Sequence, residues 1–221
     1  MSDPAAGSPD EDARLALVRF GISERAGRDL QKFVALLREW QGAHNLVGHS
    51  TLADVWSRHV ADSLQLWVHA PHAWQSWVDL GSGAGFPGLI VAIASKDHPE
   101  REVTLVESNT KKAAFLRAAI RETGANASVA AERIEAHSRR FAGVADVVSA
   151  RALAPLAELI KLGTPYLAED GVMLFLKGKG AEQELQEASQ SWNLDVVSSP
   201  SATDSSGSIL AVRNVRPKVR P

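Results

Sequence analysis

The sequence predicts an α/β protein: a mostly parallel, seven-stranded sheet flanked by helices, preceded by N-terminal helices and completed by an antiparallel C-terminal hairpin strand. Three observations predict this fold. Short apolar runs alternate with helical segments between residues 76 and 177, a rhythm typical of parallel α/β sheets. A glycine-rich stretch follows the first run, as expected at the carboxyl end of a first strand. The last two runs are joined by a serine-rich connection too short for a crossover helix.

The N-terminal part is expected to be helical after a short acidic extension. Residues 1–12 hold four acidic residues and no basic one, and we expect them to be disordered. Residues 13–70 are expected to form a helical cap, with helices over 13–20, 24–41 and 54–67. In the second helix, apolar residues recur with the i, i+3, i+4, i+7 spacing of an amphipathic helix: Leu30, Phe33, Val34 and Leu37.

The core is expected over residues 71–215 and a basic tail over 216–221, and cap and core together form one globular domain over 13–215. The strands predicted from the apolar runs are 76–80, 103–107, 127–131, 145–149 and 171–177. The helices expected between most of them are 87–96, 109–122 and 154–163. The hairpin strands are 194–199 and 207–215.

Composition excludes several classes of function. The chain has no cysteine, which excludes disulfides, iron–sulfur clusters and thiolate nucleophiles. No apolar run reaches the roughly 18 residues of a membrane span, and the first residues do not resemble a signal peptide, so we expect a cytoplasmic protein. His69 and His72 have no third ligand at a metal-binding spacing, so no metal is expected. The slightly basic body allows a nucleic-acid partner without requiring one. A monomer is the default expectation.

The stretch VDLGSGAGFPG, residues 78–88, is the main candidate for a ligand site. Its glycines Gly81, Gly83 and Gly85 let the backbone turn sharply and approach a ligand closely. The same stretch contains the GxGxxG pattern of dinucleotide-binding proteins, which on its own is weak evidence. Asp79 argues against a bound pyrophosphate, because a carboxylate at the base of the loop repels it. The carboxylate favours S-adenosylmethionine instead, since that ligand carries a sulfonium and an ammonium group.

A second acidic residue follows at the end of the next predicted strand. Glu107 lies 22 residues after Gly85, where an acid accepts hydrogen bonds from the hydroxyls of an adenosine ribose. Dinucleotide enzymes share this feature, so Glu107 indicates adenosine without choosing between the two ligands. With Asp79 and the glycines, it makes the stretch resemble motif I of the class I, Rossmann-like, S-adenosylmethionine-dependent methyltransferases. The expected cofactor is S-adenosylmethionine.

Motifs and residues that the sequence lacks reduce the range of possible methyl acceptors. Without cysteine, carbon 5 of pyrimidines cannot be methylated through a cysteine nucleophile. Enzymes that act on exocyclic base amines typically carry an Asp/Asn-Pro-Pro-aromatic loop after the fourth strand, whereas residues 149–153 read Ser-Ala-Arg-Ala-Leu. Arg151 therefore indicates another acceptor.

Seven short stretches resemble the bacterial ribosomal RNA small-subunit methyltransferase G family, also called glucose-inhibited division protein B. They are HNLVG (44–48), RHVADS (58–63), VDLGSGAGFPG (78–88), VESNTKKAAFLR (106–117), ERIE (132–135), SARALAPL (149–156) and LKGK (176–179). The likeness runs from about Leu30 to Val215. It implies methyl transfer from S-adenosylmethionine to N7 of a guanine in 16S ribosomal RNA, expected to be guanine-527. The resemblance also implies that 16S ribosomal RNA, or the small ribosomal subunit, is the binding partner.

The motif and the resemblance together imply a site. The expected cofactor residues are Asp79, Gly81, Gly83, Gly85, Phe86, Glu107, Ser108, Ile134, Glu135 and Arg151. Arg151 is also the expected catalytic residue, in an orienting role, since N7 attacks through an in-plane lone pair and needs no general base. The expected RNA contacts are Asn45, Arg58, His59, Lys111, Lys112, Arg133 and Lys177. For these residues, ordinary structural or solvated roles are equally open; Arg58 and Asp62, for example, could form an i, i+4 ion pair.

Three other functions stay open on the residues alone. The first is a methyltransferase that acts on a small molecule or a protein, with the N-terminal helices as its lid. The second is a ribosome-associated, cofactor-binding protein without turnover, which would leave Asp79 and Glu107 unexplained. The third is a dinucleotide-dependent oxidoreductase.

Overall fold

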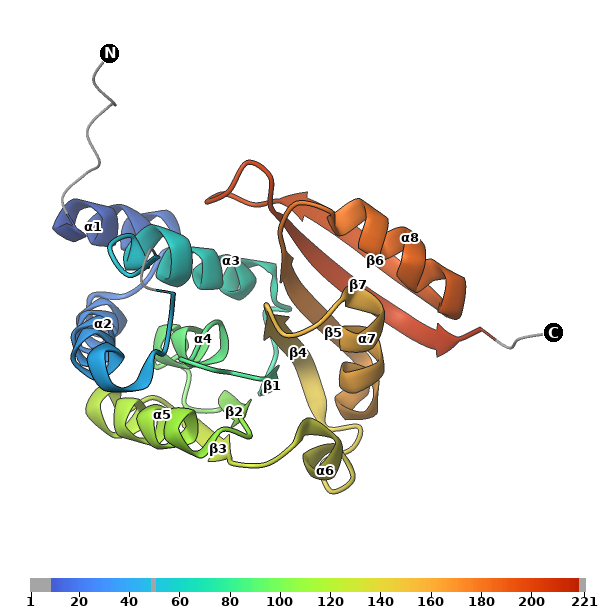
Figure 1. Cartoon of the computed structure of the whole chain (residues 1–221), viewed down its shortest axis with the longest axis horizontal. Helices are drawn as coiled ribbons and strands as arrows, with labels where there is room; N and C mark the ends of the chain where they lie inside the picture. Colours follow the sequence, from blue (N-terminus) through green and yellow to red (C-terminus); the bar gives the residue numbers. More distant parts are fainter. Residues whose placement is uncertain (1–8, 49–50, 219–221) are drawn as a thin grey trace, which may run out of the picture.

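A seven-stranded sheet organises the computed structural model, which describes residues 9–48 and 51–218 (Figure 1). Its strand order is β3-β2-β1-β4-β5-β7-β6. The strands are β1 Ser76–Leu80, β2 Glu102–Val106, β3 Ala127–Ala130, β4 Ala145–Arg151, β5 Leu167–Lys177, β6 Trp192–Pro200 and β7 Ser208–Pro217. Strands β1 to β5 pair in parallel, and β7 pairs antiparallel with both β5 and β6. The predicted mostly parallel sheet with an antiparallel C-terminal hairpin is confirmed.

Helices cover both faces of the sheet (Figure 1). One core lies between the sheet and α1 Pro9–Arg19, α2 Glu24–His44, the π-helix η2 Trp56–Ala61, α3 Asp62–His69, α4 Gly88–Ala94 and α5 Thr110–Thr123. The other lies under α6 Ile134–Ser138, α7 Leu156–Gly163, the 3-10 turn η3 Thr164–Tyr166 and α8 Ala181–Ser191. The N-terminal helices thus extend the layer on one face of the sheet and do not form a body of their own.

Alternation along the strands decides which side chain enters which core. In β1, Trp77 packs in the core under α2 to α5, while Val78 and Leu80 pack in the core under α7 and α8. In β5, Leu174 and Phe175 divide between the two cores in the same way. This period of two is that of a strand buried on both faces.

Helix α2 shows how the local sequence sets an element. The Ser23 hydroxyl accepts a hydrogen bond from the Ala26 amide at 3.3 Å and caps the first turn. Asn45 ends the helix in a left-handed conformation with φ 49°, a conformation that asparagine tolerates well. The predicted apolar stripe is buried, as expected: Leu30, Phe33, Val34 and Leu37.

Several boundaries differ from the prediction, and those at the two ends of the described chain are as follows. Helix α1 begins at Pro9, so residues 9–12, assigned to the disordered extension, form its first turn, while residues 1–8 lie outside the described residues. Apolar periodicity marks only the part of a helix that packs, which is why the first turn was missed. Strand β7 runs to Pro217 and takes up the start of the expected basic tail; residues 219–221 lie outside the description.

Two further differences between prediction and structure concern helices. The segment expected to be one helix over 54–67 is the π-helix η2 followed by α3. Helix α8 was not predicted, because only Ala181 and Ala188 of its eleven residues are buried and it carries no apolar stripe. Within the described residues, none of the helices combines the length and apolar character needed to cross a membrane.

Candidate active site at the carboxyl edge of the sheet

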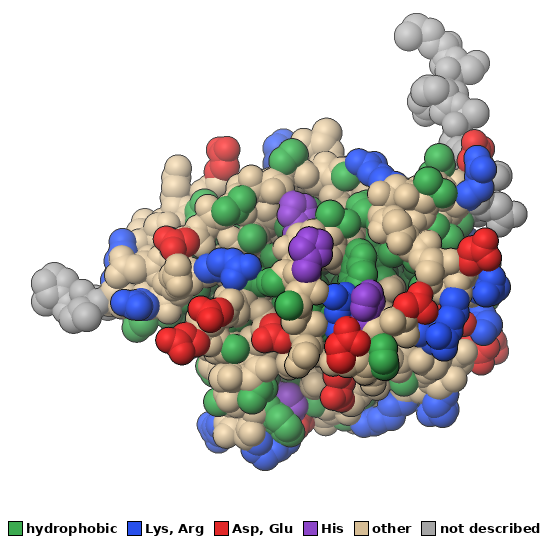
Figure 2. Space-filling model, turned by 180° about the vertical axis from the view of Figure 1, so that it is seen from behind, with side chains coloured by type: hydrophobic (Ala, Val, Ile, Leu, Met, Phe, Trp, Pro, Cys, Tyr) green, Lys and Arg blue, Asp and Glu red, His purple; other side chains and the backbone are tan. Residues whose placement is uncertain are grey.

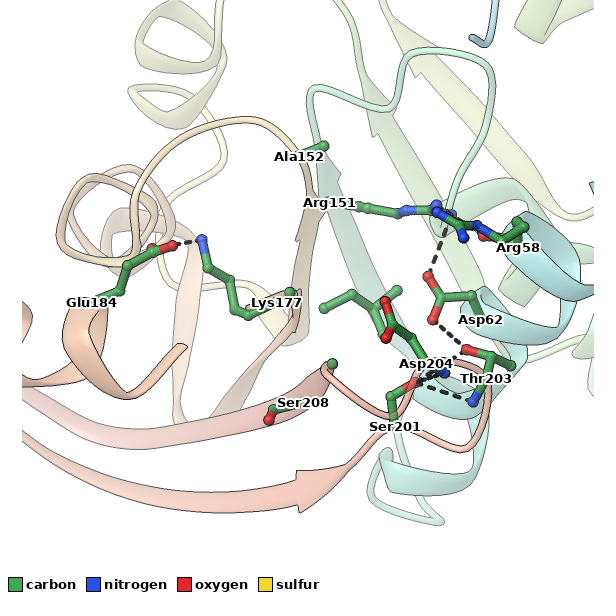
Figure 3. A pocket seen from close by; sticks show the side chains of 13 residues that line it. Arg58, Asp62, Arg151, Ala152, Lys177, Glu184, Ser201, Thr203, Asp204 and Ser208 are labelled. Atoms are coloured by element: carbon green, nitrogen blue, oxygen red, sulfur yellow. Dashed lines mark hydrogen bonds and ion pairs between the residues drawn. The ribbon is translucent and has the colours of Figure 1, made fainter. Parts of the chain in front are cut away.

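The carboxyl edge of the parallel strands holds two neighbouring cavities. The glycine-loop cavity has a volume of about 410 Å³ and is walled by the ends of β1, β2 and β4 and by α6. The hairpin cavity has a volume of about 260 Å³ and lies among η2, α3, the ends of β4 and β5, and the β6–β7 turn, residues 201–207 (Figure 3). Arg151 and Ala152 line both cavities. The two cavities therefore share a wall formed by these two residues.

The glycine-loop cavity brings together most of the residues expected to bind the cofactor. Those that line it are Gly81, Glu107, Ser108, Ile134, Glu135 and Arg151, together with Lys112 and Arg133 from the expected RNA contacts. The sequence did not single out the apolar part of the wall, which comes from Leu153 and Leu162. No pattern in the sequence marks these two leucines, so only the tertiary structure assigns them to the cavity.

Glu107 holds the glycine loop in place. Its Oε2 accepts a hydrogen bond from the Gly83 amide at 2.8 Å, and its Oε1 accepts one from the Asn109 amide at 2.7 Å. The side chain is buried yet lines the cavity. Each carboxylate oxygen has a second lone pair, so Glu107 can accept from a ligand without releasing the loop.

Glycine is required where the loop turns. Gly81 has φ +64°, and a Cβ there would lie 2.7 Å from Leu153 Cδ1. Gly85 has φ +94°, and a Cβ would lie 2.9 Å from Leu89 Cβ. Larger residues would strain the backbone and push these leucines away. Gly83 and Gly85 shape the loop, but the structure does not place them in the cavity wall.

Asp79 lies beneath the loop and does not line the glycine-loop cavity, so its expected role as a cofactor contact stays a prediction. Its Oδ1 accepts a hydrogen bond from Ser149 Oγ at 2.6 Å, and Ser149 in turn accepts one from Trp77 Nε1 at 2.8 Å. The side chain is fully buried, and this burial raises its pKa to about 6. Strand alternation explains the position, because Asp79 shares the face of Trp77 and points under α4. A Cβ on Gly88, at the start of α4, would lie 2.5 Å from Asp79 Cβ.

Phe86 and His59 also lie in the interior. Their rings stack with centroids 4.9 Å apart, and Phe33 meets Phe86 edge-on at 5.5 Å. His59 Nε2 pairs with Thr51 Oγ1 at 2.8 Å. Burial, assisted by Arg151 and Arg58, lowers the pKa of His59 to about 4, so the ring is neutral near pH 7. Phe86 and His59 thus join the N-terminal helices to the glycine loop and line neither cavity, and their expected cofactor and RNA contacts stay predictions.

Arg151 ties the sheet edge to the N-terminal helices. Its Nη2 donates to the Arg58 carbonyl at 2.9 Å, and its Nη1 lies 3.5 Å from Asp62 Oδ2. Asp62 therefore pairs with Arg151, and the possible i, i+4 pair with Arg58 is not formed within the described residues. Residues 56–61 form a π-helix, whose wider turn does not align residues four apart. Ala152, with φ 49°, turns the chain sharply just after Arg151.

A hydrogen-bond network docks the β6–β7 turn on α3, and sequence reasoning missed it. Gln65, which is 2% exposed, places Nε2 within 3.2 Å of Ser201 Oγ and 3.1 Å of Thr203 Oγ1, and its Oε1 accepts from the Ala202 amide at 2.6 Å. Thr203 Oγ1 also donates to Asp62 Oδ1 at 2.9 Å. The only signal in the sequence is a glutamine on a mostly apolar helix.

Lys177 is held in an ion pair and not presented to solvent. Its Nζ lies 2.7 Å from Glu184 Oε2 and donates to the Ala154 carbonyl at 3.2 Å. The same Glu184 oxygen accepts from the Leu156 amide at 2.6 Å. The Lys177–Glu184 and Arg151–Asp62 pairs lie on opposite sides of the hairpin cavity (Figure 3). Lys177 therefore fixes the 152–155 loop, which forms part of both cavities.

Comparison with known proteins decides the family. The model of the rRNA small subunit methyltransferase G family matches residues 27–209. A ribosomal RNA small subunit methyltransferase G from Cereibacter sphaeroides is 46% identical over 198 residues, which cover 89% of this chain and 95% of the relative. One from Methylobacterium nodulans is 47% identical over 207 residues, covering 93% and 96%. The chain belongs to the rRNA small subunit methyltransferase G family.

Solved structures confirm the fold of this family member as Rossmann-like. Cofactor-bound Rv0187 from MTB superposes with a TM-score of 0.64 at 15% identity, covering 95% of this chain and 98% of that one. The SAH-bound Podospora anserina methyltransferase PaMTH1 superposes with a TM-score of 0.57 at 13% identity, covering 96% and 99%. Membership in an rRNA methyltransferase family disfavours a dinucleotide oxidoreductase and a methyltransferase for small molecules or proteins.

Three of the expected RNA contacts lie outside both cavities: the buried His59 described above, Asn45 and Lys111. Asn45 is exposed at the end of α2, and Lys111 is exposed at the start of α5, where Asn109 Oδ1 caps its amide at 3.0 Å. On the face seen in Figure 2, basic and acidic side chains are interspersed, so charge alone does not mark an RNA-binding surface there. Among the residues that the structure describes, no three histidine or carboxylate side chains gather as a metal site.

Proposed function

We propose that this member of the rRNA small subunit methyltransferase G family transfers a methyl group from S-adenosylmethionine to N7 of a guanine in 16S ribosomal RNA. One observation carries the proposal: two cavities meet at the carboxyl edge of the sheet and share Arg151. A methyl donor in one cavity and a base in the other would bring the reacting atoms together at this shared wall. Membership of the family supports RNA as the acceptor.

The residues of the glycine-loop cavity fit an adenosine-bearing donor. Glu107 supplies a buried carboxylate for the ribose hydroxyls, and Ile134, Leu153 and Leu162 supply apolar surface for the adenine. Gly81 lets the backbone approach the ligand. The volume of about 410 Å³ lies within the roughly 300–1,000 Å³ that is usual for small-molecule pockets. When bound, S-adenosylmethionine supplies an electrophilic methyl group on a sulfonium.

The acceptor atom explains why the site needs no general base. Guanine N7 carries an in-plane lone pair and no proton, so no proton has to leave. The protein's task is to hold N7 in line with the methyl group, and positioning of this kind contributes up to roughly 7–11 kcal/mol. The Lys177–Glu184 and Arg151–Asp62 ion pairs support that task, because they fix the 152–155 loop and the wall between the cavities.

Arg151 is proposed to orient the guanine and not to neutralise charge. The methylated ring is cationic, so a nearby guanidinium stabilises it only if the contact is with an acceptor such as O6. Asp62, 3.5 Å from Nη1, offsets the charge of Arg151. Burial lowers the pKa of Arg151, and Asp62 opposes this shift. An arginine guanidinium stays protonated near pH 7, so it remains available as a donor.

The decisive experiment is methyl transfer to small ribosomal subunits and to protein-free 16S RNA, both from cells that lack this activity, followed by mapping of the modified base. We expect one N7-methylguanine, at guanine-527. A lack of incorporation into either substrate would leave a cofactor-binding protein without turnover as the better explanation.

A matched pair of variants tests the role of Arg151. Arg151→Ala is expected to lose most methyl transfer to RNA, because the orienting donor and the partner of Asp62 are both removed. Arg139→Ala serves as the control, since Arg139 is exposed beyond α6 and lines neither cavity. Full turnover by Arg151→Ala on the ribosomal substrate would contradict the assigned role.

A further inference from the structure

We propose that the hairpin cavity is the binding site of the target guanine and that Asp204 is its specificity-determining residue. Asp204 lies in the β6–β7 turn and lines this cavity. In the proposal its carboxylate accepts hydrogen bonds from N1–H and the N2 amino group of the base. The inference rests on the proposed function and adds the group that recognises the acceptor.

The place and size of the cavity suit one nucleobase. It shares Arg151 and Ala152 with the glycine-loop cavity, so a base inside it lies next to the donor site. Its volume of about 260 Å³ equals that of about nine water molecules at about 30 Å³ each. A single planar base fits such a space, whereas a longer stretch of RNA has to remain outside.

Of the three carboxylates that line the cavity, Asp204 has the most freedom to bind a ligand. Asp62 accepts from Thr203 and Gln65 through Oδ1 and faces Arg151 through Oδ2. Glu184 accepts from Lys177 and the Leu156 amide. Asp204 uses only Oδ1, which accepts from the Ser206 amide and hydroxyl, both at 2.8 Å. Within residues 9–48 and 51–218, no hydrogen bond or ion pair reaches its Oδ2.

The arrangement matches the donors and acceptors of guanine. When N7 points toward the glycine-loop cavity, the adjacent O6 comes next to Arg151, a donor. The N1–H and N2 donors then point along the following edge, into the hairpin cavity. Figure 3 shows the Asp204 side chain between the Lys177–Glu184 and Arg151–Asp62 pairs, and in the proposal it meets that edge. Carboxylates accept readily from such paired donors, whereas adenine offers no N1–H.

The negative charge of Asp204 is expected to accelerate methyl transfer as well as to select guanine over other bases. Methylation at N7 makes the ring cationic, so N1–H and the N2 amine become stronger donors as the reaction proceeds. A carboxylate that accepts from them binds the transition state more tightly than the ground state, which accelerates the reaction. The hydrogen bonds from Ser206 lower the pKa of Asp204 and keep it ionised near pH 7. Its charge also offsets the nearby Arg58.

The test is Asp204→Asn. The amide oxygen of asparagine can still accept from Ser206, so the turn is retained, but the free position becomes an NH₂ donor that opposes N1–H and N2–H. Small subunits are reconstituted from 16S transcripts that carry either guanine or inosine at the mapped position; inosine lacks the N2 amine. We expect turnover on guanine to fall about 10- to 100-fold, as for loss of a bidentate base contact. We also expect the guanine-to-inosine preference of the wild type to shrink in the variant.

Two controls separate the loss of guanine recognition in Asp204→Asn from a general effect of the substitution or a loss of cofactor binding. Asp195→Asn alters an aspartate on β6 that pairs with Asn214 outside the cavity, and it is expected to behave as wild type. The affinity for S-adenosylmethionine is expected to be unchanged in Asp204→Asn, because Asp204 does not line the glycine-loop cavity. The base preference is a ratio and is independent of the fraction of folded enzyme, so it decides the question even for a destabilised variant.

The outcomes are distinguishable. If the wild type methylates guanine N7 and Asp204→Asn keeps both its turnover and its base preference, the assignment of Asp204 is wrong while the proposed function stands. If the wild type methylates no guanine at N7, the proposed function itself fails, and the wild-type measurement alone reveals it.

Discussion

The buried carboxyl of Asp79 predicts a specific pH dependence of stability. Its pKa lies near 6 in the folded protein, against an ordinary value of 3.8, because burial disfavours its charge. Each pH unit of such a difference corresponds to about 1.4 kcal/mol, so the ionised form costs the fold about 3 kcal/mol. The contribution of the protonated carboxyl is fully present below about pH 4 and is lost as the pH rises through about 6.

Replacing Asp79 with asparagine removes this titration and keeps an oxygen for the Ser149 hydroxyl, which lies 2.6 Å from Oδ1. The difference in unfolding free energy, wild type minus Asp79→Asn, is therefore expected to fall by about 2 kcal/mol between about pH 4.5 and about pH 7.5. Urea unfolding followed by the fluorescence of the six tryptophans measures it at each pH. The other titrating groups are common to both proteins and cancel in the difference.

A difference in unfolding free energy that stays constant within about 0.5 kcal/mol over this range would refute the reasoning, since it would mean that burial does not raise the pKa of Asp79.

The ionisation of Asp79 is also expected to affect cofactor binding. A cationic donor above the loop stabilises the ionised form, so the affinity of the wild type for S-adenosylmethionine is expected to rise from about pH 5 to about pH 7. Asp79→Asn is expected to lack that rise, which titration calorimetry can measure.

Three further changes test other parts of the site. Glu107→Gln is expected to weaken S-adenosylmethionine binding about 10-fold or more in calorimetry, because hydrogen bonds to a charged group are worth about 1.5–3 kcal/mol; unchanged affinity would exclude the ribose contact. Gly88→Ala places a Cβ 2.5 Å from Asp79 Cβ and is expected to cost about 1–3 kcal/mol of unfolding free energy. Its control, Gly42→Ala in α2, meets no atom within 4 Å and should stabilise by about 0.5–1 kcal/mol; equal effects of the two alanines would contradict the packing argument. Gln65→Ala is expected to lower stability by about 1–3 kcal/mol and slow RNA methylation while donor affinity is retained; a parallel loss of donor affinity would show that the hairpin and glycine-loop cavities are not independent.

The local sequence pattern was sufficient to predict those helices and strands whose apolar residues recur in step with the faces that are buried. The apolar runs of β1, β4 and β5 are buried on both faces, and the stripe of α2 matches the face that packs. Helix α8 packs on the core mainly through Ala188 and the half-buried Leu185, which leaves only a weak periodic signal to detect. The π-helix η2 was also beyond a sequence pattern, because its register differs from the α-helical spacing on which the prediction relied.

The sequence by itself determined the strand-and-helix rhythm, the glycine loop and the acid at the end of β2, because each depends on neighbours close in the chain. Only the tertiary structure decided that Asp79 lies under the loop, that Arg151 pairs with Asp62, and that the β6–β7 turn closes a second cavity. Thr203 and Asp62, which meet there, are 141 positions apart. Contacts of this kind form when separate elements pack on the sheet, and no local spacing records them.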